Sequence, residues 1–153
     1  MADGVAGEAL SALQSALLEA GAVGRLVGLR IGTFTAASGA QMQADASMEN
    51  EPGFLFDALV LPDGPKGVEA LAADGHTDEF IKDQFRHGKT ILALGASRAL
   101  LDAAKIPAAL PSGEPDPGIL RRDGADLQAT IGAFIAALAK HRHPVRDADP
   151  PPV

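Results

Sequence analysis

The side chains that could do chemistry lie in two short stretches of the chain. In the first, Asp74, His76 and Asp78 alternate a carboxylate, an imidazole and a carboxylate, which could hold a metal ion or supply a general base. A further protein ligand is not evident, so we predict no metal site. We favour a loop in which Asp78 caps the next helix and His76 forms local hydrogen bonds. The other histidines are expected at solvated helix ends: His87, His141 and His143.

The second stretch is the apolar run 91–94 and the turn that follows it. Ser97 is its only hydroxyl, but Gly95-Ala96-Ser97-Arg98-Ala99 lacks the final glycine of the G-x-S-x-G nucleophile motif. We therefore interpret Ser97 as a helix-capping residue and predict no catalytic residue. The alternatives are a catalytic pair of Ser97 with His76, and a small-molecule or anion site at helix N-termini. The anion site would be formed by Gly64, Gly95, Ala96 and Ser97.

Strands and helices alternate along the chain and must position these residues. The runs 56–61 and 90–94 are short and almost wholly apolar, as buried parallel strands are. Helices are predicted over 8–20, 67–73, 77–86, 96–104 and 124–140, and further strands over 25–35, 41–45 and 119–120. This order predicts an α/β fold of three layers, with a mostly parallel sheet and helices on both faces.

A long stretch, residues 54–120, carries a family resemblance. Its Asp-Gly-His and Asp-Gln-Phe-Arg-His segments, at 74–76 and 83–87, resemble the C-terminal domain of large-subunit haem catalases. The resemblance covers roughly residues 1–140. It implies a flavodoxin-like fold of the DJ-1/PfpI and class I glutamine amidotransferase type. In that fold a cysteine nucleophile occupies the elbow after the strand, and the matching residue here is Gly95, so the resemblance implies a degenerate elbow.

The two ends of the chain depart from this expected domain. A doubly wound domain opens with a strand that is central in the order 2-1-3-4-5, whereas this chain starts at the loop after it, residues 2–5. We expect unpaired backbone on the neighbours of that strand, unless a shifted sheet or a partner strand compensates. We place the domain at residues 1–143, truncated at its start, and expect the proline-rich residues 144–153 to be disordered.

Composition limits the chemistry further. The 153 residues carry a formal net charge of −7, which disfavours nucleic acid and anionic membrane surfaces, and no signal peptide is evident, so we expect a cytoplasmic protein. There is no Cys, hence no thiol nucleophile or disulfide. There is no Tyr, the residue through which catalases bind haem iron. We expect this chain to bind no cofactor, the haem belonging to the core that the family implies.

The function expected from the resemblance is that of a non-catalytic accessory domain. In large-subunit catalases such a domain follows the haem core and lies outside a homotetramer, so hydrogen peroxide detoxification belongs to the core. The expected partners are that haem core or a second copy of this chain. Stabilising the assembly and a chaperone-like surface are the roles we consider. The alternatives are a DJ-1/PfpI-like hydrolase or glyoxalase using Ser97 and His76, and a module that binds anions or small molecules.

Overall fold

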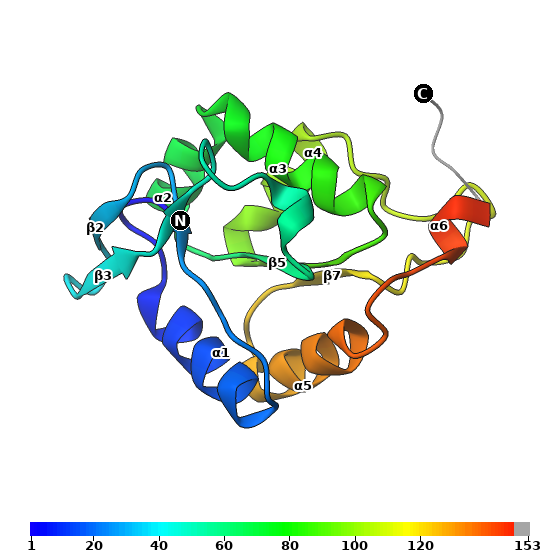
Figure 1. Cartoon of the computed structure of the whole chain (residues 1–153), viewed down its shortest axis with the longest axis horizontal. Coiled ribbons are helices and arrows are strands. Elements are labelled where there is room, and N and C mark those ends of the chain that lie inside the picture. Colours follow the sequence, from blue (N-terminus) through cyan, green and yellow to red (C-terminus); the bar gives the residue numbers. More distant parts are fainter. Residues whose placement is uncertain (149–153) are drawn as a thin grey trace.

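The computed structural model describes residues 1–148 and has helices on both sides of a small parallel sheet (Figure 1). The sheet has the order β5-β6-β7 and all its strands are parallel. Its strands are β5 (Ala58–Leu61), β6 (Thr90–Leu94) and β7 (Ile119–Arg122). The longer helices are α1 (Gly7–Glu19), α2 (Pro65–Ala72), α3 (Gly75–Arg86), α4 (Arg98–Ala103) and α5 (Leu127–Leu138). The predicted three-layer α/β fold is therefore confirmed.

Strand β6 is the centre of the core, and its apolar sequence explains why. All five of its residues are at most 1% exposed. Because side chains alternate across a strand, Ile91 and Ala93 pack with α2, α3 and α4, while Leu92 and Leu94 pack with α1 and α5. Burial of each large aliphatic side chain contributes about 1.5–3 kcal/mol. Figure 1 shows the same two layers, with α1 and α5 below the sheet and α2, α3 and α4 above it.

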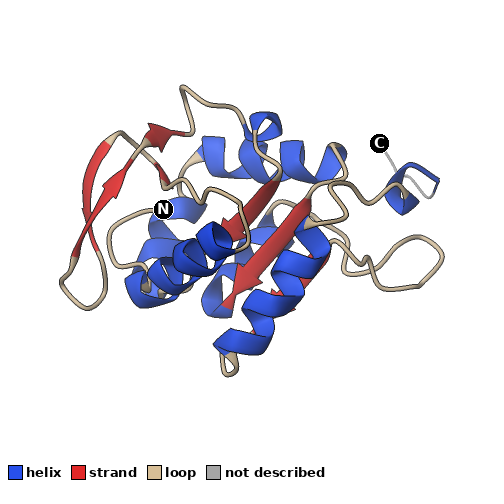
Figure 2. Cartoon of the chain, turned by 60° about the horizontal axis from the view of Figure 1, so that its bottom comes forward, coloured by secondary structure: helices blue, strands red, loops and turns tan. Residues whose placement is uncertain are grey.

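The predicted strand 25–35 is wrong in its continuity, because the chain bends in its middle. It forms β1 (Val27–Gly28) and β2 (Gly32–Thr35), separated by a bend. Gly32 has φ of +128°, a conformation that side-chain-bearing residues rarely adopt. Strand β1 pairs in parallel with β4 (Ala46–Ser47), and β2 forms an antiparallel hairpin with β3 (Gln41–Ala44), which projects from the body in Figure 2.

The expected disorder from residue 144 onward is wrong for residues 145–148. These form helix α6 (Val145–Ala148), and residues 149–153 lie outside the described part of the chain. The Arg146 guanidinium is buried against the Asp116 carboxylate, with 2.5 Å between Nε and Oδ2, and it donates to the Lys89 carbonyl at 2.8 Å. A buried, hydrogen-bonded ion pair of this kind holds α6 against the body.

Two further elements complete the fold. They are the single-turn 3-10 helices η1 (Gly53–Leu55) before β5 and η2 (Gly95–Ser97) after β6.

His143, expected to be solvated, is instead 3% exposed, and its Nε2 lies 2.8 Å from the Thr90 hydroxyl. Burial, followed by the nearby charge of Arg146, lowers the pKa of His143. None of the described helices has the length and apolar character that crossing a membrane requires.

Candidate functional site

The turn from β6 into η2 and α4, the expected elbow, is closed by a carboxylate of the chain itself. Gly95 lies at its apex with φ of +53°, and a Cβ at this position would overlap the Asp63 carboxylate. Asp63 comes from the end of β5. Its Oδ1 accepts hydrogen bonds from the Gly64 amide at 2.7 Å and the Ala96 amide at 2.8 Å. Two amides of the predicted anion site therefore already bind an anion, which is Asp63.

Ser97 lies inside the protein and serves the backbone. It has no exposed surface. Its hydroxyl accepts from the Leu94 amide at 2.9 Å and lies 2.8 Å from both the Leu61 and Leu94 carbonyls, to one of which it donates. These contacts tie the end of β5 to the turn after β6. A hydroxyl in this setting is out of reach of a substrate, and no described hydrogen bond joins it to His76.

The Asp74, His76 and Asp78 stretch has a structural role at the start of α3. Asp74, rather than Asp78, is the capping residue, since α3 begins at Gly75, earlier than predicted. The Asp74 carboxylate accepts from the His76 amide at 2.8 Å, and the His76 ring lies 3.1 Å from it. Asp78 instead pairs with Lys82 at 2.7 Å. Within residues 1–148 no group of three acidic or histidine side chains is placed to hold a metal ion.

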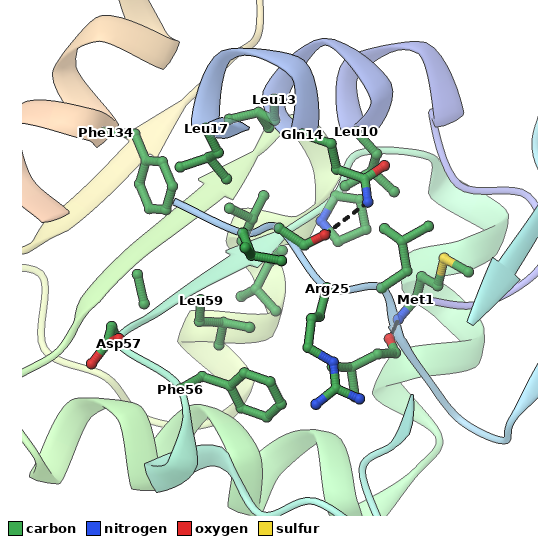
Figure 3. Close-up of a pocket in the computed structure, with 18 of the residues that line it drawn as sticks. Met1, Leu10, Leu13, Gln14, Leu17, Arg25, Phe56, Asp57, Leu59 and Phe134 are labelled. Atoms are coloured by element: carbon green, nitrogen blue, oxygen red, sulfur yellow. Dashed lines mark hydrogen bonds between the residues drawn. The ribbon is translucent and has the colours of Figure 1, made fainter. Parts of the chain in front are cut away.

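A large apolar cavity lies elsewhere, beside the free edge of β5 (Figure 3). Its volume is about 570 Å³, within the range of ligand sites in proteins. One wall is the segment 24–27 that leads into β1, and the opposite wall is the segment 55–62 that contains β5. Helices α1 and α3 contribute further lining residues. Six of the apolar side chains that line it, from α1, the β5 segment and α5, are Leu10, Leu13, Leu17, Phe56, Leu59 and Phe134.

Few polar side chains reach the cavity, and those that do already have partners. Arg25 forms a two-bond ion pair with Glu51, at 2.6 and 2.9 Å, and its guanidinium lies 5.9 Å from the centre of the Phe56 ring. Gln14 donates to the Gly24 carbonyl at 2.9 Å, as the dashed line in Figure 3 marks. The cavity therefore offers mainly apolar side chains and backbone groups.

Met1 lines this cavity and pairs with β1 on the side that faces away from β4. Its amine donates to the Val27 carbonyl, and its carbonyl accepts from the Leu29 amide at 3.2 Å. Bonds to the residues on either side of Gly28 are the pattern of a parallel ladder. The Met1 amine is buried, and desolvation lowers its pKa from the usual 8.0 to about 5. An amine that is mainly neutral at pH 7 thus lies between β1 and the cavity.

The sequence matches one protein family along almost its whole length. A sequence model of the C-terminal domain found in long catalases matches residues 2–148. This chain belongs to that family. Catalase HPII of Pseudomonas aeruginosa is 28% identical over 148 residues, which cover 97% of this chain and 20% of that protein. Catalase C of Rhizobium meliloti is 31% identical over 140 residues, which cover 92% of this chain and 19% of that protein.

The catalase C-terminal domain thus spans about a fifth of the length of these curated relatives. Its fold is that of the DJ-1/ThiJ/PfpI proteins. The solved ThiJ/PfpI domain protein of Brachyspira murdochii superposes with a TM-score of 0.78 at 18% identity, over 90% of this chain and 92% of that one. This likeness concerns the fold alone. The expected family and fold are both confirmed, whereas a Ser97 and His76 hydrolase is not favoured.

Sequence reasoning missed two features of the catalase C-terminal domain. It did not assign the Asp63 carboxylate to the elbow, where this carboxylate binds the Ala96 amide 33 residues further along the chain. A local signal existed, because an acid directly after a buried parallel strand lies at the edge where such folds place their sites. It also missed the Met1 bridge to β1, which depends on a contact over 26 residues.

Proposed function

We propose that this catalase C-terminal domain is a non-catalytic accessory domain that docks on a haem-bearing catalase core and stabilises it. The observation that carries the non-catalytic part is the Asp63 carboxylate above Gly95, which takes both the space and the amides that an elbow offers to a substrate. Family membership supports the docking part. The net charge of −7 disfavours nucleic acid and anionic membrane surfaces as partners, and we also propose a cytoplasmic setting.

The residues of this chain do not fit haem, so we assign the haem to the core. The chain has no Tyr and no Cys. Of its four histidines, none is among the described residues that line the cavity, and the buried one, His143, bonds Thr90. An apolar cavity without a Tyr, Cys or His ligand has none of the groups that most commonly hold haem iron. In this proposal the chain contributes a docking surface to the catalase core and no group that binds the haem.

The test combines the purified chain with a long catalase from which the matching C-terminal fifth has been removed. We expect the chain alone to decompose no hydrogen peroxide and to hydrolyse no ester. Mixed with the shortened catalase, it should co-elute and lengthen the half-life of peroxide decomposition on heating. The Brachyspira murdochii ThiJ/PfpI protein, which shares the fold, is the control and should do neither. Peroxide decomposition by the chain alone, or equal protection by the control, would contradict the proposal.

Chaperone-like holding of unfolded protein is a second candidate, favoured by the exposed apolar residues beside the cavity. Phe54 is 47% exposed and Leu55 is 61% exposed. Together with the apolar cavity they form a surface of the kind that binds other polypeptides. The chain should suppress light scattering by an aggregating, heat-denatured enzyme, and the double substitution of Phe54 and Leu55 by Ser should remove this suppression. Suppression that survives the substitution would exclude this surface.

A further inference from the structure

We propose that residues 141–148 form an acid-sensitive latch, which is docked on the body while His143 is neutral and is released when His143 takes up a proton. The latch consists of the turn after α5, His143 and helix α6. It lies at the edge of the molecule, beside the loop that leads into β7 (Figure 1). The inference goes beyond the proposed accessory role, because it gives the domain a way to change its surface with pH.

His143 is the first anchor of the latch, and its setting suits a neutral imidazole. The residue is buried, and its Nε2 lies 2.8 Å from the hydroxyl of Thr90, the first residue of β6. The ring packs against the backbone of Gly118, where an added Cβ would come within 2.3 Å of the ring carbon Cδ2. The described partner of Nε2 is thus a hydroxyl, which bonds a neutral ring and brings no counter-charge for a charged one.

The charges around His143 oppose a proton on its ring. Burial, followed by the guanidinium of Arg146, lowers the pKa of His143 below the usual 6.5. Asp116 acts in the opposite direction, but this carboxylate already pairs with Arg146. The other titratable groups on the neighbouring elements are Lys140, His141 and Arg142 after α5, Arg86 and His87 at the end of α3, and the ion pair of Lys89 and Asp57 before β6 and β5. All but one of these groups are basic, so they supply little counter-charge for an imidazolium.

Arg146 is the second anchor, and it covers an acidic and aromatic surface of the body. Its guanidinium forms two hydrogen bonds with Asp116, at 2.5 and 3.1 Å, and lies 4.9 Å from the centre of the Phe85 ring. Asp116 is 6% exposed and Phe85 is 8% exposed. Because both anchors belong to one short segment, release of the latch uncovers this carboxylate and this ring together.

The latch is held mainly by these polar contacts. None of its described residues belongs to the apolar clusters of the core, and Val145 of α6 is 39% exposed. A segment with so little apolar burial can open locally while the rest of the molecule stays folded. The loss of one anchor is therefore expected to release the segment and leave the sheet intact.

A strained residue separates the latch from α5. His141 has φ of +62°, a conformation that residues other than glycine seldom adopt. Such strain persists only while the surrounding structure holds it. The Lys140 amide donates to Ala137 and the His141 amide donates to Leu138, so α5 is closed before the latch begins. Residues beyond His141 can thus leave the body without unwinding α5.

The direction of the pH effect follows from proton linkage. The pKa of a released His143 is the usual 6.5, and that of the docked residue is lower. Between these two values the released segment binds more protons than the docked one. Docking is therefore fully present above pH 6.5 and is lost as the pH falls. The ratio of docked to released segment should fall by up to tenfold for each pH unit, until the docked ring is protonated as well.

The first test attaches a nitroxide spin label to Val145→Cys, which is specific because the chain has no other cysteine. The label should be ordered at pH 7.5, and the ratio of mobile to ordered label should rise severalfold, and at most tenfold, between pH 6.5 and 5.5. The same label at Ala136→Cys, an exposed position within α5, should stay ordered throughout and show that the domain remains folded. A ratio at Val145 that does not change with pH would overturn the proposal.

A matched pair of histidine variants assigns the effect to one ring. His143→Gln keeps a polar nitrogen for Thr90 but takes up no proton, so it should remove the pH dependence of the label. His141→Gln changes the neighbouring histidine, whose side chain is 66% exposed, and should leave the dependence as it is. Release on acidification that survives His143→Gln would overturn the proposal.

A measurement on the unchanged chain decides the question even where the glutamine variant fails to dock. NMR follows the imidazole signals of His143 as the pH is lowered. The account predicts that this ring titrates below pH 6.5 and that the exposed ring of His141 titrates at a higher pH. A His143 ring that titrates at pH 6.5 or above would show that docking does not favour the neutral form, and would contradict the latch.

Discussion

The elbow after β6 and the cavity beside β5 differ in how their backbone groups are satisfied. At the elbow, Asp63 and Ser97 take up the amides and carbonyls of the turn. Beside β5, one edge of the strand has no described partner, and the amine of Met1 is buried without a counter-charge. The elbow is therefore closed by groups of the chain itself, whereas the cavity beside β5 is open. Within the described residues, the chain thus satisfies the backbone of the elbow with its own side chains and leaves the outer edge of β5 open.

The largest expected effect comes from forcing a side chain into the closed elbow. Gly95→Ala adds a Cβ that overlaps the Asp63 carboxylate at a residue with positive φ. The strain of the positive φ and the displacement of two hydrogen bonds should together lower the free energy of unfolding by about 4 kcal/mol. Urea unfolding measures this loss. The control is Gly113→Ala, at φ of +89° in open space, which should cost only about 1 kcal/mol. Equal losses would mean that the elbow is not closed.

A smaller effect is expected when the closing carboxylate is removed. Asp63→Ala leaves the Gly64 and Ala96 amides without their acceptor and should cost about 2–3 kcal/mol in urea unfolding. The two freed amides should then bind an anion from solution. Phosphate should therefore raise the melting temperature of Asp63→Ala and leave that of the wild type unchanged. A wild type that is stabilised by phosphate would show that Asp63 does not occupy these amides.

The buried Met1 amine beside the cavity should make the stability of the protein depend on pH. Burial lowers the pKa of the Met1 amine to about 5, so between pH 5 and 8 the unfolded chain binds more protons than the folded one. Stability must then rise with pH, by about 2 kcal/mol from pH 5 to 7 for this group. Urea unfolding across this range measures the rise. Acetylation of Met1 keeps an N–H for Val27 but removes the charge, and should flatten the profile. An unchanged profile after acetylation would assign the dependence to other groups.

Local patterns in the sequence were enough to predict the frame of the molecule. The continuous apolar run of β6 predicted a central buried strand. The sequence segments that begin at Asp74 and Asp83 indicated the catalase C-terminal domain. The elements that sequence reasoning missed depend on contacts between distant residues. Arg146 and Asp116 are 30 positions apart, so a proline-rich end with one arginine gave no sign of a buried ion pair.

The start of α3 and the cavity both show that features set by the three-dimensional arrangement of the elements cannot be predicted from local sequence. Either Asp74 or Asp78 could cap a helix by type, and only the path of the chain from α2 decides for Asp74. The cavity has no residue pattern of its own, because it is the space that β1, β5, α1 and α3 leave between them. Gly95 could be placed from the family resemblance, whereas the closing role of Asp63 required the fold.

The most direct test of the account is amide hydrogen exchange, followed by NMR on the free chain. The account predicts that the Gly64 and Ala96 amides at the elbow exchange slowly, because Asp63 accepts from both. It also predicts that the amides of β5 that do not bond β6 exchange much faster than any amide of β6. Slow exchange along both edges of β5, together with fast exchange at Gly64 and Ala96, would contradict the account.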